Sequence, residues 1–155
     1  MKKGMLSTTI ILAALALLLI PTPGLPQDAI EQRDKLMKST DKALKAVRAA
    51  AKQMDYATLQ VRAKEIVDNM GRMLDLFPEG SLSEDSNAHP SIWDKWDEFS
   101  KHRDKVREAA ENVARAAAAQ DDAQILAQVK VIGGMSSGGC GGCHVSFNKK
   151  RMKKK

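Results

Sequence analysis

The sequence predicts an all-α protein that folds as an antiparallel four-helix bundle. Alanine is abundant, aromatic residues make up only 4% of the chain, and proline is nearly absent after residue 26, a composition that favours helices over sheets. Beyond that point the chain contains four amphipathic stretches, whose apolar residues recur at three- and four-residue steps. Short connections make such stretches antiparallel neighbours. At 155 residues, the chain fits a single domain with a modest core.

The N-terminal segment has the layout of a secretory signal. Lys2 and Lys3 precede an apolar run over residues 6–20, and the sequence "PTPG" ends this run. The run is shorter than the roughly 20 residues needed to span a bilayer. We therefore expect residues 1–26 to be a signal peptide that directs the protein to the periplasm in a bacterium. The alternative is an uncleaved anchor, the one case in which we expect contact with a membrane.

The first two amphipathic stretches cover about residues 28–54 and 56–77, and each keeps its apolar residues on one stripe. In the first, the stripe contains Ile30, Met37, Leu44 and Ala51 at every seventh position, with Thr40, Val47 and Met54 beside them; in the second, it contains Leu59, Ile66, Met70, Met73, Leu74 and Phe77. The sequence "PEGSLSEDSNAHPS" then predicts the one long loop, because proline, glycine and small polar residues interrupt the pattern.

The third and fourth stretches complete the predicted bundle. The third starts near Ser91, a good N-cap residue, and the fourth starts at Asp121 and Asp122. Their stripes contain Ile92, Trp96, Phe99, Val106, Ala110, Val113 and Ala117, and then Ile125, Val129 and Ile132. We expect the fourth helix to continue into the glycine-rich segment, so that residues 27–148 form the domain and residues 149–155 a basic tail.

The two cysteines of the chain lie in the sequence "CGGCH". On a helix, Cys140, Cys143 and His144 project from one face. A thioredoxin-like dithiol needs a βαβ setting, and a zinc site needs about four ligands, so neither fits this chain. A disulfide between the two thiols would close a tiny loop and add little stability. The third interpretation is covalent haem attachment, for which C-x-x-C-H is the recognised motif. The alternative is a haem-free helical bundle with an interaction role.

Four further sequence motifs are informative: "CGGCHVSFNKK" around the haem motif, "HPSIW" at the entry to the third helix, and "RMLDLFPEGS" and "DKLMKSTDKAL" in the second and first helices. Together they resemble the cytochrome c′ family of exported four-helix bundles, and most of all its low-spin cytochrome c-556 branch. The resemblance implies one haem c, bound through Cys140 and Cys143, with His144 as the proximal iron ligand. Many members have an arginine where this chain has Asn148.

The residue on the other side of the iron decides the function. The resemblance to the low-spin branch implies that Met37 is the distal ligand, which would make the protein a periplasmic electron carrier with His/Met ligation and a raised reduction potential. The alternative is a five-coordinate haem that binds nitric oxide or carbon monoxide. Methionine is also a common residue in hydrophobic cores, so Met37 could instead pack in the core without binding iron. We favour this packing role for Met54, Met70 and Met73.

Other side chains receive weaker assignments. Arg33 fits either a haem propionate or solvated surface. We expect Trp93 and Trp96 to anchor the core, with one of them at the haem edge, and Phe147 to pack on the proximal side. Both remaining histidines, His89 and His102, are expected to be exposed. We also expect the glycine-rich residues 133–142 to be a frayed or irregular part of the fourth helix before haem attaches.

Charge and motif content limit the partners. The chain has a net charge of +6, which falls to +4 without residues 1–26, and the excess is concentrated in the basic tail. A solvated tail is the favoured interpretation, and docking to an acidic partner is the alternative. Nucleic-acid binding is not expected. We also do not expect an enzyme, because the sequence shows no pattern of a paired acid and base or of an activated nucleophile. The expected partners are unidentified redox proteins, and both a monomer and a homodimer remain open.

Overall fold

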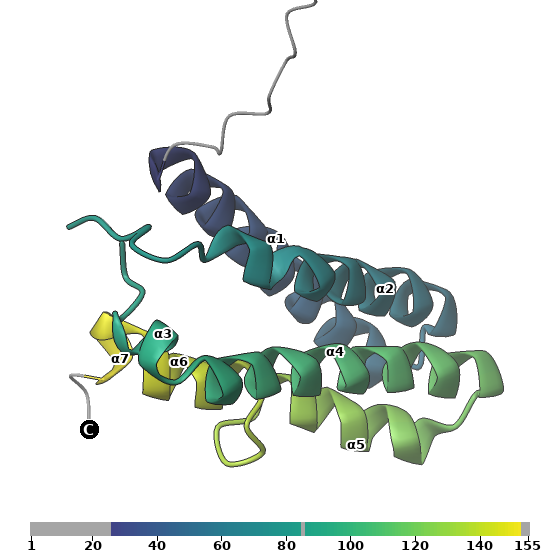
Figure 1. Cartoon of the computed structure of the whole chain (residues 1–155). Coiled ribbons are helices and arrows are strands. Elements are labelled where there is room, and N and C mark those ends of the chain that lie inside the picture. Colours follow the sequence, from purple (N-terminus) through teal and green to yellow (C-terminus); the bar gives the residue numbers. More distant parts are fainter. Residues whose placement is uncertain (1–25, 85, 153–155) are drawn as a thin grey trace, which may run out of the picture.

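The computed structural model describes residues 26–84 and 86–152 and confirms the all-α four-helix bundle (Figure 1). Nearly all of the expected signal peptide and the last three residues of the basic tail lie outside the described residues. The elements are α1 (Pro26–Gln53), α2 (Tyr56–Met73), a 3-10 turn (Leu74–Leu76), α3 (Ser91–Asp94), α4 (Trp96–Ala119), α5 (Asp122–Gly133), α6 (Cys140–Phe147) and α7 (Lys149–Met152). In this part of the chain, no helix combines the length and apolar content needed to cross a bilayer.

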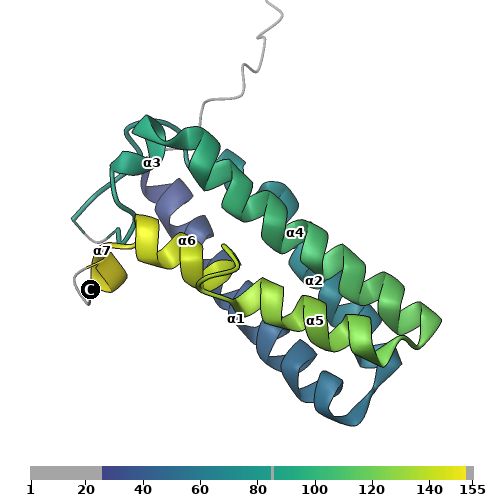
Figure 2. The same ribbon diagram turned by 90° about the horizontal axis from the view of Figure 1, so that it is seen from below.

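The bundle has up-down-up-down topology, with α1, α2 and α4 as its first three helices. The fourth helical column contains two separate helices, α5 and α6, which follow each other along the bundle (Figures 1 and 2). The long loop, α3, α6 and α7 gather at the end of the bundle where α1 begins. This end therefore combines segments that are far apart in the sequence.

Side chains define the two turns at the opposite end. Asp55 caps α2, because its carboxylate accepts a hydrogen bond of 3.1 Å from the backbone N–H of Thr58. Asp121 caps α5 in the same way, with a bond of 3.0 Å from Gln124 N. The two turns are joined by a hydrogen bond of 2.9 Å that the Tyr56 hydroxyl donates to Asp122. The fourth stretch thus begins where the sequence predicted.

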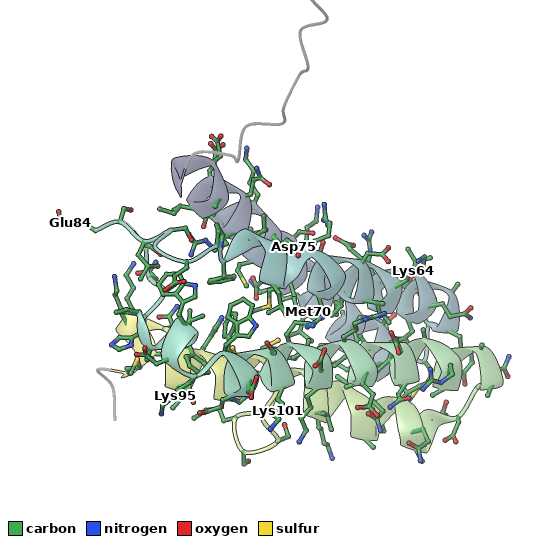
Figure 3. All side chains as sticks on the ribbon, in the orientation of Figure 1. Lys64, Met70, Asp75, Glu84, Lys95 and Lys101 are labelled. Atoms are coloured by element: carbon green, nitrogen blue, oxygen red, sulfur yellow. The ribbon has the colours of Figure 1, made fainter. Side chains whose placement is uncertain are left out.

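The core follows the predicted stripes closely. Phe99, Leu59 and Ile66 are among its largest fully buried side chains. Figure 3 shows Met70 pointing between α2 and α4, whereas Lys64 and Lys101 point away from the bundle. Burying these apolar faces supplies most of the stability of such helices, since isolated helices of this length are marginal in water.

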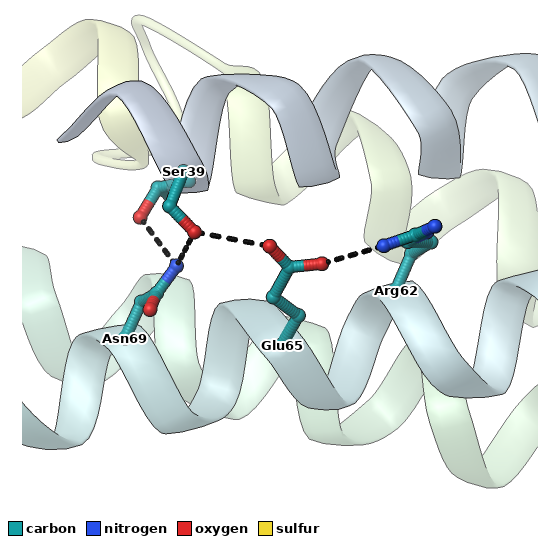
Figure 4. Close-up of polar contacts among 5 residues, drawn as sticks. Ser39, Arg62, Glu65 and Asn69 are labelled. Carbon is teal, nitrogen blue, oxygen red and sulfur yellow. Dashed lines mark hydrogen bonds and ion pairs between the residues drawn. The ribbon is translucent and has the colours of Figure 1, made fainter. Parts of the chain in front are cut away.

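One buried polar cluster fixes α1 against α2 (Figure 4). The amide of Asn69, which is 3% exposed, donates hydrogen bonds of 3.0 Å to Ser39 Oγ and 3.2 Å to Thr40 Oγ1. Ser39 donates in turn to Glu65, whose other carboxylate oxygen is paired with Arg62. Because the buried amide has these partners, the cluster specifies how α1 is rotated relative to α2.

The predicted fourth helix is interrupted, which corrects the expectation of one continuous element. The α-helix α5 ends at Gly133, residues 134–139 form turns, and helical structure resumes at Cys140. Gly138 has φ +75°, a backbone conformation that other residues rarely adopt. Residues 134–139 are thus non-helical, whereas Gly133 and residues 140–142 are helical. Ordering of this segment by haem attachment stays a prediction. Two smaller interruptions occur at Lys95, which separates α3 from α4, and at the 3-10 turn after α2.

We predict that Gly139→Ala destabilises the protein. A Cβ at this position would overlap the backbone carbonyl oxygens of Val131 and, at 2.5 Å, Ile132, so the turn would have to move away from the end of α5. The expected loss in the free energy of unfolding is about 1–3 kcal/mol, measured by denaturant unfolding. Gly71→Ala is the matched control: nothing lies within 4 Å of its Cβ, and we expect a gain of about 1 kcal/mol. A neutral Gly139→Ala would contradict the close approach.

Candidate cofactor site

A cavity of about 530 Å³ lies at the end of the bundle where α6 is located. Its walls come from α1, the end of α2, the long loop, α4 and α6, and they contain all four of the predicted site residues. These four are Met37, Cys140, Cys143 and His144. Residues more than 100 positions apart in the sequence therefore face one space, whose volume is typical of sites for a sizeable organic ligand.

The short helix α6 carries the haem motif along one wall of this cavity. Cys143 is buried, Cys140 is half-buried, and His144 is exposed. The first turn of α6 is joined to the preceding loop by backbone hydrogen bonds from Cys143 N to Gly139 O (3.0 Å) and from Gly142 N to Gly134 O (3.2 Å). This arrangement presents two thiols and an imidazole from one helical turn, as the motif spacing predicts.

Burial keeps both thiols in their protonated form. It raises the pKa of Cys143 to about 12, and the nearby Cys140 and Glu98 add to this effect. The pKa of Cys140 is raised by the same principal cause. Thiolates are the reactive form of cysteine, so the pair is poorly suited to redox catalysis. The protonation state of these thiols therefore argues against a dithiol switch.

The environment of His144 favours its neutral form. Removal of part of the ring from bulk solvent lowers its pKa, and the charge of Arg151 lowers it further. A neutral imidazole is the form that binds a metal. His144 therefore has the protonation state required of an iron ligand.

Three methionines reach the cavity from α1 and α2. Met37 is half-buried on α1, whereas Met70 and Met73 on α2 are 3% and 4% exposed. The two methionines of α2 are core residues, as expected, and also line the cavity. The Asn69 cluster acts on Met37 through its neighbour Thr40, which lies three residues further along α1 and also lines the cavity. The rotation of α1 that presents Met37 is thus fixed by buried hydrogen bonds.

Arg33 is buried at 6% exposure, which rules out the solvated alternative for this residue. Its Nη2 donates a hydrogen bond to the carbonyl oxygen of Ser81, and its guanidinium lies 4.7 Å from the ring centroid of Phe77. Its Nη1 is buried without a hydrogen-bond partner among the described residues. A buried cationic donor that lines the cavity and lacks a partner is suited to an anionic group of a ligand.

Aromatic rings close the inner part of the site. Phe99 packs edge-to-face against Phe77 and Phe147, with centroid distances of 4.8 and 5.4 Å. Phe147, the last residue of α6, therefore packs against α4, and its place on the proximal side of the haem stays a prediction. The indole of Trp93 donates a 3.0 Å hydrogen bond to Phe77 O, and Trp96 packs on Phe99. Both tryptophans support the core, but neither is among the residues that line the cavity.

The two other histidines are half-buried, which corrects the expectation that they are exposed. His89 is held 2.8 Å from the Ser91 hydroxyl at the start of α3. His102 on α4 makes a 2.6 Å hydrogen bond with the carbonyl oxygen of Gly138 and lines the cavity. It therefore ties the glycine-rich loop to α4.

Sequence reasoning overlooked Arg103, which also lines the cavity. The signal was present in the helical spacing. Arg103 lies four residues after Phe99 and three before Val106, and His102 fits the same face of α4. His102 was expected to be exposed and Arg103 was given no role, although their spacing placed both beside predicted core positions.

The comparisons with known proteins agree with this site. The family model described as Cytochrome C' matches residues 28–148. The chain belongs to the cytochrome c′ family. It is 32% identical to cytochrome c-554 of Cereibacter sphaeroides over 88% of this chain and 95% of that protein, and 32% identical to cytochrome c′ of Pararhodospirillum photometricum over 79% and 97%. The crystal structure of cytochrome c′ from Rubrivivax gelatinosus superposes with a TM-score of 0.67 and 27% identity, over 79% of this chain and 96% of that one.

As a member of the cytochrome c′ family, the protein is a c-type cytochrome with one covalently bound haem c. The residues present fit this group. The cavity offers two thiols, a neutral imidazole and methionine sulfur, and the free Nη1 of Arg33 offers a partner for a carboxylate. Haem has a matching group for each of them: vinyl groups for the thiols, iron for the imidazole and the methionine sulfur, and propionates for Arg33.

We predict that Arg33→Met destabilises the haem-loaded cytochrome. The change keeps an unbranched side chain but removes the hydrogen bond to Ser81 and the contact with Phe77. Hydrogen bonds of charged groups contribute about 1.5–3 kcal/mol, and we expect a loss of this size in the free energy of unfolding. The control is Arg115→Met on the exposed surface of α4, expected to change stability by less than about 0.5 kcal/mol. Equal effects of the two changes would show that Arg33 is not a buried anchor.

Proposed function

We propose that this cytochrome is a low-spin electron carrier in which His144 and Met37 are the axial iron ligands and Cys140 and Cys143 hold the haem by thioether bonds. The observation that carries the proposal is that Met37, on α1, lines the same cavity as the haem motif on α6. Histidine and methionine together fill both axial positions and raise the reduction potential. The haem supplies the one-electron chemistry.

The other residues that line the cavity also suit an electron carrier. Ile92, Phe99 and Val106 give it an apolar wall that limits access of water to the redox centre. Arg33 is proposed to pair with a propionate, which would fix the orientation of the haem. The relatives are cytochromes, and we infer that the protein itself is not an enzyme.

The competing function is a five-coordinate haem that binds small gases. It is favoured by the names of similar proteins, since a 32% identical relative and the Rubrivivax gelatinosus structure are both cytochrome c′. In that case Met37 would be a packing residue, as Met70 and Met73 are. The two functions differ in whether the Met37 sulfur binds the iron.

Electron paramagnetic resonance and near-infrared absorption of the ferric protein distinguish the two. The proposal predicts a low-spin signal together with a sulfur-to-iron charge-transfer band from methionine. A predominantly high-spin signal would support the gas-binding alternative. A low-spin signal without the methionine band would reject Met37 as the ligand while leaving a six-coordinate haem.

We further propose that the protein acts in the periplasm, with residues 1–26 as a cleaved signal peptide and residues 27–148 as the haem domain. The charged and apolar order of the first 24 residues supports export, and the family match over 28–148 supports the domain boundaries. N-terminal sequencing of the periplasmic protein tests the cleavage site. An intact Met1 in a membrane fraction would support the uncleaved anchor, and sedimentation would distinguish a homodimer from a monomer.

A further inference from the structure

The start of the basic tail is fixed against the body of the protein. Lys149 donates two hydrogen bonds to the long loop, from its backbone N–H to Asn87 O (2.8 Å) and from Nζ to Ser86 O (3.0 Å). The N–H of His89 donates to Phe147 O, the last residue of α6 (2.9 Å). A tail that only kept the protein soluble would not need these bonds.

Asn148 turns the chain from α6 into α7. It forms an isolated β-bridge with Ala88, and its side-chain oxygen accepts hydrogen bonds from the backbone N–H groups of Lys150 (3.0 Å) and Arg151 (3.3 Å). This residue stands where many family members have an arginine, and here it caps the turn that carries the positive charges. Lys150 and Arg151 are both exposed.

The charges of the chain are strongly segregated. Residues 123–155 contain seven Lys and Arg and no Asp or Glu, whereas residues 27–122 contain all 19 acidic residues and 16 basic ones. The haem-motif helix and α7 belong to the basic part. This separation is one along the sequence, because Glu31, Asp34 and Asp41 of α1 also line the cavity. The positive charge is therefore local to α7, and it acts on an approaching charged molecule over about a Debye length, roughly 10 Å at 0.1 M salt.

The basic turn lies beside the cavity. Asn148, Asn87 and Ala88 all line the cavity, and they are the residues to which α7 is attached. We define the entrance surface as the exposed side chains of Lys150 and Arg151 of α7.

We propose that the entrance surface is the docking site of an acidic redox protein, which exchanges electrons with the haem past α6. The proposal rests on the electron-transfer function proposed above. Positive charge beside the haem-bearing wall would attract a partner with a negative surface and orient it for transfer. An anionic membrane is the less suitable occupant, because stable membrane binding also needs exposed apolar anchors. The large exposed apolar residues of the described chain are Val61, Leu126 and Met135, none of them in α7.

Small redox probes of opposite charge test the sign of the entrance surface in the haem-loaded protein. Oxidation of the reduced cytochrome by ferricyanide, an anion, and by tris(phenanthroline)cobalt(III), a cation, is followed by stopped flow. We expect Lys150→Gln/Arg151→Gln to slow the anionic probe by about 3- to 10-fold at low salt and to leave the cationic probe unchanged or faster. The effect should vanish near 1 M salt, where the Debye length is about 3 Å.

The matched control is Lys52→Gln/Arg115→Gln, which also removes one lysine and one arginine. Both residues are exposed at the opposite end of the bundle, near the ends of α1 and α4. This variant should alter the anionic rate by less than about 1.5-fold. Equal slowing by the two double variants would overturn the proposal, because it would show a response to net charge alone.

Binding measurements distinguish the occupants and do not depend on spin state. Polyglutamate should perturb the amide signals of α6 and α7 in the wild-type protein and lose this effect in Lys150→Gln/Arg151→Gln. Stronger binding to phosphatidylglycerol vesicles than to polyglutamate would overturn the proposal in favour of a membrane. A high-spin ferric signal with the same polyglutamate result would reject the electron-carrier function while retaining the acidic docking site.

Discussion

Met37→Ala is expected to convert the reduced cytochrome from a six-coordinate to a five-coordinate haem. Alanine has no donor atom, so the cavity wall on α1 would no longer supply a ligand opposite His144. If the sulfur closes the site 99% of the time, its removal raises the apparent affinity for carbon monoxide about 100-fold. The reduction potential should also fall, because methionine ligation raises it. Absorption spectra of the reduced variant with graded carbon monoxide, and a redox titration, measure both effects.

The other cavity methionines provide the controls. Met70→Ala and Met73→Ala remove buried side chains from the same cavity, and each should cost about 2–5 kcal/mol of stability. Neither should open the iron to carbon monoxide. If Met73→Ala opens the site and Met37→Ala does not, the distal ligand has been assigned to the wrong helix.

Cys140→Ala/Cys143→Ala is expected to abolish covalent haem attachment. Each thiol is proposed to form one thioether bond, so the double variant retains none, and its mass should be that of the polypeptide alone in denaturing solvent. We expect any haem-containing form of the variant to be less stable than the wild-type cytochrome, because non-covalent contacts alone would hold the haem.

The single variants Cys140→Ala and Cys143→Ala control for the double variant. Each should retain haem through the remaining thioether bond and show the mass of the adduct. Haem that stays covalently bound in the double variant would contradict the attachment site. Amide exchange across α6 in these proteins also reports how far attachment orders the glycine-rich segment.

The sequence predicted the bundle well because its core stripes are regular. Val47 and Ile66 are fully buried at expected positions, and Asp55 and Asp121 cap helices next to strongly periodic segments. The break before Cys140 was harder to place. Glycine indicated weak helix, but where the chain turns depends on its packing against the carbonyls at the end of α5, which local propensity does not encode.

The site was predictable where the chemistry is local and less so where it depends on distant contacts. Cys140, Cys143 and His144 form one short motif, and their common face follows from helical geometry. The burial of Arg33 depends instead on Ser81, 48 residues away in a loop without periodicity. The fixed position of α7 likewise depends on hydrogen bonds that Lys149 donates, from its side chain to Ser86 O and from its backbone to Asn87 O, and sequence alone showed only a cluster of basic residues.

Addition of carbon monoxide to the reduced, unmodified cytochrome tests the central claim most directly. If the Met37 sulfur holds the sixth position, the reduced spectrum is low-spin and changes little or slowly when the gas is added. Immediate, complete conversion to the carbon monoxide adduct from a high-spin reduced spectrum would show that the position is open, and would contradict the proposed electron carrier in favour of a gas-binding cytochrome.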